Sequence, residues 1–67
     1  MIKTMAVAPG MWQVTSGGRW WTVARVASAT MVGWHITNEA GRTINEQGQL
    51  GRKLIAAVEA KIKEDAA

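Results

Sequence analysis

The chain has 67 residues, no cysteine and a net charge of +3 at neutral pH. The length predicts a single domain spanning residues 1–67, and a chain this short buries only about 60% of the surface that it exposes when unfolded. The composition excludes a disulfide framework and a thiolate metal site. The first residues lack the apolar run of roughly 7–15 positions that an export signal needs, so we expect a cytoplasmic domain. No run of residues approaches the ~20 apolar positions of a membrane span.

Two glycines mark the first turn of the predicted sheet. Gly17 and Gly18 fit a two-residue hairpin loop, in which both central residues need a positive φ. The loop predicts strands over residues 10–15 and 19–26. Residues 1–9 are expected to form an N-terminal segment ahead of the sheet.

Two further turns complete the predicted sheet. Residues 27–30 form a weaker turn and lead into a strand over residues 31–38. Residues 38–42 fit a three-residue hairpin loop, with Gly41 in the left-handed position of a G1 bulge. A short fourth strand over residues 42–45 follows, although the sequence leaves open whether it pairs. We therefore expect an antiparallel meander of three to four strands within residues 10–45.

The three turns together predict one apolar face. If the second hairpin closes on a two-residue loop, Val23 pairs with Trp34 and Trp21 pairs with Ile36. A slip of one residue in any turn would scatter the apolar side chains over both faces. The residues expected on this face are Trp12, Val14, Trp21, Val23, Val32, Trp34, Ile36 and Ile44, with Arg25 near its end.

The adjacent tryptophans separate the two faces, because neighbouring residues of a strand point to opposite sides. Trp21 is expected in the core, and Trp20 on an open face that carries His35, Gln13 and several threonines. Three explanations for Trp20 are open. It lies flat against its neighbours or under residues 1–9, it forms the centre of a dimer or partner interface, or it stacks on an unpaired base.

A change of period predicts a helix over residues 46–64. Apolar residues recur every four positions, and alanines among them raise the helix propensity. Asn45 fits the N-cap, Gly48 and Gly51 weaken the first turns, and residues 65–67 form a frayed tail. The expected class is α+β, with the helix packed on the tryptophan face of the sheet through Leu50, Leu54, Ile55, Val58 and Ile62.

The residues are better suited to binding than to catalysis, so we expect no enzyme activity, no cofactor and no small-molecule substrate. His35 is the only histidine, and a general base would need an orienting carboxylate, which residues 1–38 lack. One histidine, no cysteine and scattered acidic residues predict no metal site. The Gly17-Gly18 pair is followed by no helix, unlike a phosphate-binding loop.

Nucleic acid binding is the first functional hypothesis. Residues 1–38 contain three basic residues and no acidic residue, which favours an anionic partner. The meander places Arg19 and Arg42 at one end of the sheet, where a pair of arginines can straddle a phosphate backbone. The residues expected to contact nucleic acid or another partner are Arg19, Trp20, Arg42, Arg25, Thr22, His35, Gln13 and Lys3.

The order of the elements resembles that of plant AP2-type domains and of the arm-binding domains of tyrosine integrases. The resemblance implies a free sheet face that enters the major groove of DNA. It concerns element order alone, and the arginine or lysine that such domains carry on the reading face is absent from this face. Binding would therefore be weak and strongly salt-dependent.

A protein-interaction module is the alternative hypothesis. The uncharged face of threonine, methionine and tryptophan suits a protein surface, or a second copy of the chain, better than it suits DNA. By analogy of size, the chain could be an accessory or inhibitory protein of a phage or mobile element that docks on a larger protein.

Overall fold

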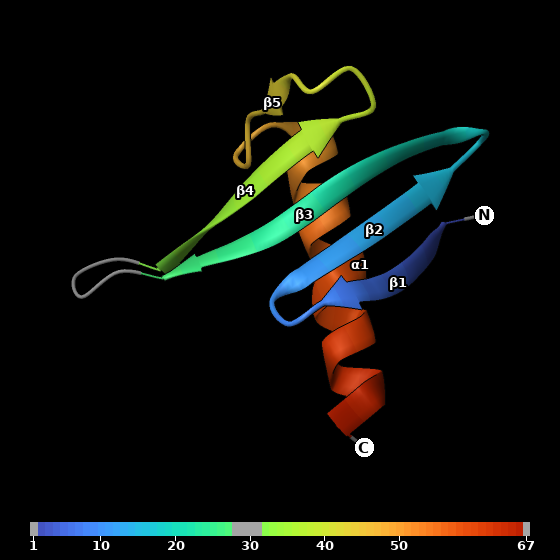
Figure 1. Ribbon diagram of the computed structural model, residues 1–67, viewed down its shortest axis with the longest axis vertical. Helices are drawn as coiled ribbons and strands as arrows, with labels where there is room; N and C mark the ends of the chain where they lie inside the picture. The colour runs from blue at the N-terminus through green and yellow to red at the C-terminus, as the bar shows by residue number, and fades with distance from the viewer. Residues whose placement is uncertain (1, 28–31, 67) are drawn as a thin grey trace.

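The computed structural model describes residues 2–27 and 32–66, which form a two-layer α+β fold. A five-stranded antiparallel sheet has the order β1-β2-β3-β4-β5, and a C-terminal helix lies against β1, β2 and β3. Figure 1 shows α1 behind the sheet and crossing its strands. The elements are β1 Lys3–Ala8, β2 Met11–Ser16, β3 Arg19–Ala27, β4 Val32–Asn38, β5 Thr43–Ile44 and α1 Gln49–Ala66. The predicted fold class is confirmed.

The segment expected to precede the sheet is its first strand, β1, so the sheet has five strands rather than three or four. Proline presets φ for the second position of a type II turn and glycine supplies the positive φ at the third. Pro9 and Gly10 meet this requirement, and Gly10 has a φ of 74°. Ala6 pairs with Trp12, and the register shifts before Ala8 pairs with β2, as in a β-bulge.

Two of the three predicted turns have the predicted register. Both glycines of the first hairpin loop have a positive φ, and Val14 pairs with Trp21. In the last hairpin Gly41 has a φ of 83°, and Ile36 pairs with Ile44. The short fourth strand of the prediction is therefore a true strand, β5.

The second hairpin pairs in a register two residues away from the predicted one. Val23 pairs with Ile36 instead of Trp34, and Arg25 pairs with Trp34. The predicted loop at residues 28–29 lies outside the described residues. A shift of two residues keeps every side chain on its face, because the side-chain period of a strand is two. The predicted apolar face therefore persists although the pairing was wrong.

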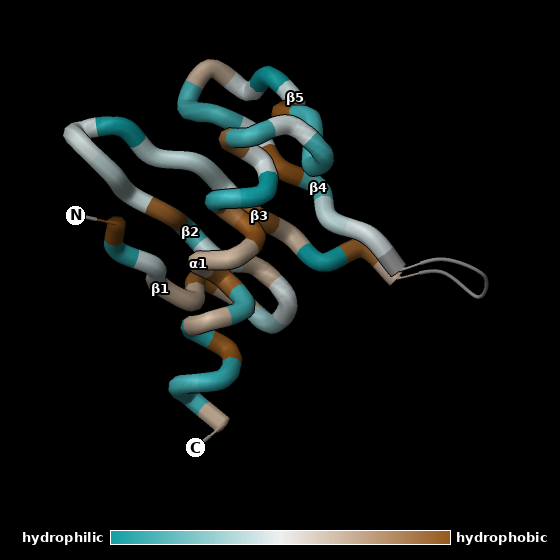
Figure 2. The backbone as a smooth tube through the Cα atoms, turned by 180° about the vertical axis from the view of Figure 1, so that it is seen from behind, coloured by the Kyte–Doolittle hydropathy of each residue, from teal (hydrophilic) through white to brown (hydrophobic). Residues whose placement is uncertain are grey.

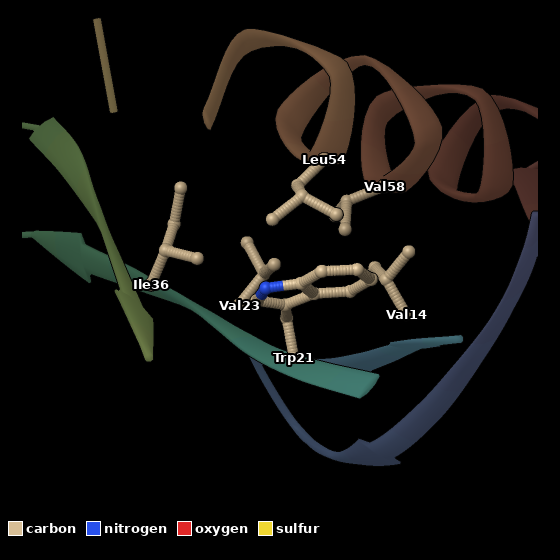
Figure 3. Close-up of a cluster of buried hydrophobic side chains, with 6 residues drawn as sticks. All are labelled: Val14, Trp21, Val23, Ile36, Leu54 and Val58. Carbon is tan, nitrogen blue, oxygen red and sulfur yellow. The ribbon is translucent and has the colours of Figure 1, made fainter. Parts of the chain in front are cut away.

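The core lies between α1 and the apolar face of the sheet. Trp12 and Trp34 pack at its margin with ring centroids 6.0 Å apart. Val32 is also predicted on this face, but its side chain lies outside the described part of the structure. Figure 3 shows the six buried side chains, which are Val14, Trp21, Val23, Ile36, Leu54 and Val58.

The helix begins and ends later than predicted, at Gln49 and Ala66. Polar and apolar segments alternate along it (Figure 2). Asn45 does not cap the helix, because its side-chain oxygen accepts a hydrogen bond from the Gln47 N–H (3.0 Å) in the preceding turn. Leu50, predicted in the apolar stripe, is 38% exposed. The first helical turn instead directs the buried Gly51 inward.

Gly51 allows the helix to approach the turn before it. A Cβ at this position would overlap the carbonyl oxygen of Asn45 and lie 2.8 Å from the Cα of Glu46. The Glu46 carboxylate in turn accepts a hydrogen bond from the Trp34 N–H (3.2 Å), which ties the turn to β4. The glycine expected to weaken the helix is therefore a packing requirement.

Replacement of Gly51 by alanine is expected to destabilise the fold by about 1–3 kcal/mol, because backbone atoms must move to admit the methyl group. Gly33→Ala is the matched control, since the nearest atom to an added Cβ there is Glu46 Oε1 at 3.9 Å. Urea unfolding of both variants measures the difference. Equal losses of stability would contradict the close packing at Gly51.

The two adjacent tryptophans are expected to differ strongly in their contribution to stability. Trp21 is 5% exposed and Trp20 is 39% exposed. Trp21→Ala should cost about 3–5 kcal/mol as a large-to-small core change, whereas Trp20→Ala should cost about 1 kcal/mol.

Thermal and urea unfolding measure both effects. Trp21→Phe should recover part of the loss, because it keeps a ring in the core and removes an indole N–H that lacks a partner among the described residues. Equal destabilisation by Trp20→Ala and Trp21→Ala would show that the two faces are assigned wrongly.

Candidate interaction surface

The side of the sheet opposite α1 is not covered by any described element (Figure 1). The strands contribute alternate residues to it, and we call this surface the open face. Its largest side chain is Trp20. The register places on it Lys3, Met5, Met11, Gln13, Thr15, Trp20, Thr22, Ala24, Val26, Gly33, His35, Thr37 and Thr43.

Trp20 lies near the Gly17-Gly18 end of the open face. It pairs with Thr15 of β2, which pairs in turn with Lys3 of β1. The N-terminal strand therefore lies beside β2 within the sheet and does not cover the indole. Neighbouring side chains cover part of Trp20, and 39% of its surface stays exposed.

Five of the eight predicted site residues lie on the open face. Gln13 and Thr22 pair directly between β2 and β3 and are half-buried. His35 is exposed and pairs with Ala24. The five residues are Lys3, Gln13, Trp20, Thr22 and His35, and Lys3 is the one that carries a fixed charge.

Two of the predicted arginines lie on the other side of the sheet. Arg19 and Arg25 share the face of Trp21, because alternate residues of β3 point toward the helix. The Arg19 Cζ lies 5.3 Å from the centroid of the Trp21 ring. The Arg25 Cζ lies 5.8 Å from that of Trp34. Both distances are within the range of cation–π contacts, so these arginines border the core and not the open face.

The third arginine, Arg42, belongs to the loop between β4 and β5. Its N–H donates to Asn38 Oδ1 and its carbonyl accepts from the Asn38 N–H, both at 2.9 Å. Arg19 lies beside the same loop, where its Nε is 3.2 Å from Glu39 Oε1. Both members of this ion pair are exposed, so water screens their attraction. A carboxylate thus accompanies the arginine expected to meet phosphate.

Sequence reasoning named Lys3 as a binding residue but missed that residues 3–8 form a strand, β1, that widens this surface. Met5 extends the open face beyond Gln13, its partner in β2, and is 58% exposed. The signal that could have located it is the Pro9-Gly10 turn, which joins β1 to β2. The open face is therefore wider and more apolar than predicted.

The Arg19–Glu39 pair is expected to add less than about 1 kcal/mol to stability, as is usual for exposed ion pairs. A double-mutant cycle with Arg19→Gln and Glu39→Gln, followed by urea unfolding, measures the coupling directly. A coupling free energy above about 2 kcal/mol would contradict the view that solvent screens this contact.

Comparison of the chain with protein-family models, with curated proteins and with solved structures gave no match. Within residues 2–27 and 32–66, no helix is both long and apolar enough to cross a membrane. In the same residues, no three histidine, cysteine or acidic side chains are grouped so that they could hold a metal ion.

Proposed function

We propose that the chain is a non-enzymatic protein-interaction module whose open face binds an uncharged, apolar surface of another protein molecule. The observation that carries the proposal is the exposure of Trp20 on a face where, among the described residues, Lys3 alone carries a fixed charge. Tryptophan is enriched among the residues that dominate binding at protein interfaces. Interface centres are also depleted of charge, which the composition of this face matches.

The distribution of apolar surface supports the same function. Six hydrophobic side chains form the buried core, whereas seven large ones are exposed among the described residues. Burial of apolar surface contributes roughly 25 cal/mol for each Å² removed from water. A partner on the open face would cover four of the exposed side chains, which are Met5, Met11, Trp20 and Val26.

Nucleic acid is the second candidate partner. The excess of positive charge in residues 1–38 favours it, and an exposed indole such as Trp20 can stack on a base. Arg19 and Arg25, however, lie against tryptophans on the helix side. Phosphate contacts from the open face would depend on Lys3, so affinity would be low and would fall steeply with salt. Nucleic acid is therefore a less favoured partner of the open face than protein.

Trp20→Ala is expected to weaken binding to the protein partner by more than about tenfold, as truncation of a central interface tryptophan does. A photo-reactive amino acid at Thr22, introduced in cells that express the chain, would identify the partner, including a second copy. Titration of the purified partner then measures affinity. Leu50→Ala is the matched control, because Leu50 is as exposed as Trp20, at 38% against 39%, but belongs to α1 and not to the open face.

Three results would contradict the proposal. Crosslinks from Thr22 could join nucleic acid instead of protein. Oligonucleotides could shift the amide signals around Trp20, with shifts that fade as salt is added. Finally, Trp20→Ala could bind the identified partner as tightly as the unmodified chain.

A further inference from the structure

The strand β1 lies at one end of the sheet, and among the described strands it pairs with β2 alone. The Arg25 N–H donates to the Gly10 carbonyl at 2.8 Å. This bond points from Gly10 toward β3. Because backbone groups alternate sides along an antiparallel strand, the even-numbered residues of β2 also direct their N–H and C=O groups toward β3. The odd-numbered residues direct theirs toward β1. Their partners in β1, such as Met5, bond back to β2. The N–H and C=O groups of Thr4 and Ala6 therefore point outward from the edge.

An open groove of about 1140 Å³ lies alongside this edge, between β1 and α1. Its helix side is lined by Ala56, Ala57 and Ala60. Thr4 lies on the strand side and faces the helix, because it pairs with the buried Val14. The small side chains leave room for the alternate residues of an added strand. Strand addition needs both features, a free edge and space beside it.

Lysines border the groove. Lys3, Lys53 and Lys61 line it, against one lining carboxylate, that of Glu64. Lys61 also pairs with Asp65 one helical turn away, at 3.3 Å. The remaining excess of positive charge favours an acidic occupant, because complementary charge steers binding and selects the partner.

We propose that β1 accepts an extended, acidic segment of a partner protein as a sixth strand. Its main chain bonds to Thr4 and Ala6, its small apolar side chains fill the groove, and its carboxylates approach Lys3 and Lys53. A second copy of β1 fits less well, since β1 contains no acidic residue and pairing two copies would gather their lysines. The lining of the groove shares Lys3, Met5, Gln13 and Thr15 with the open face. The outward backbone groups of β1 and the helix alanines are not part of that face, so the inference goes beyond the proposed function.

The test uses two blocked synthetic peptides, one alternating valine with glutamate and one alternating valine with lysine. NMR titration of the full isotope-labelled chain should show amide shifts along β1 with the glutamate peptide. Hydrogen exchange at Thr4 and Ala6 should slow, because their N–H groups become bonded. The lysine peptide should bind about tenfold more weakly.

Two variants separate backbone pairing from charge. Ala6→Pro removes the outward N–H and leaves the β1–β2 ladder bonded, so it should abolish binding of the glutamate peptide. Lys53→Glu should weaken binding by about tenfold. Lys63→Glu makes the same charge change beside Arg25 and Trp34, so it should bind like the unmodified chain. Thermal unfolding checks that each variant folds.

The proposal fails if both peptides bind equally or not at all at low salt, or if Lys53→Glu and Lys63→Glu behave alike. Shifts centred on Trp20 would also overturn it. Concentration-dependent protection of Thr4 and Ala6 without any peptide would assign the edge to a second copy and overturn it as well. None of these outcomes decides the role of the open face, which the Trp20→Ala comparison tests separately.

Discussion

The packing of α1 against the helix side of the sheet is the interaction on which the rest of the structure depends. Leu54 and Val58 of the helix are 2% and 0% exposed, and Trp21 of the sheet is 5% exposed. Because side chains alternate along a strand, the helix buries every second residue and leaves the others uncovered. The described part of the chain holds one helix, so the fold that buries Trp21 also leaves Trp20 on the outside.

The same alternation sorts the charged residues. Arg19 and Arg25 fall on the helix side, where each lies over an indole ring. The open face is left with little charge and with large apolar side chains. The groove beside β1 differs in character, since it combines small side chains with lysines and lies along the end strand of the described sheet. The open face and the groove beside β1 therefore differ in both charge and side-chain size.

Local patterns were sufficient to predict the two faces, and the reasons are physical. The Gly17-Gly18 pair, whose turn needs positive φ, located the first hairpin. The side-chain period of two kept the predicted faces even though the register of the second hairpin is shifted by two residues. The strand β1 was missed because small residues such as Thr4 and Ala6 give a weak apolar alternation. The packing role of Gly51 was not predictable, since it comes from the approach of Asn45 in space. The Arg19–Glu39 contact likewise depends on how the chain folds back.

The division of the adjacent tryptophans between core and solvent is the central claim, and one NMR measurement tests it directly. A neutral, soluble gadolinium chelate enhances the relaxation of protons in proportion to their accessibility. The ring protons of Trp20 should be strongly enhanced and those of Trp21 only weakly, in line with exposures of 39% and 5%. Equal enhancement of the two rings, or stronger enhancement of Trp21, would contradict the account.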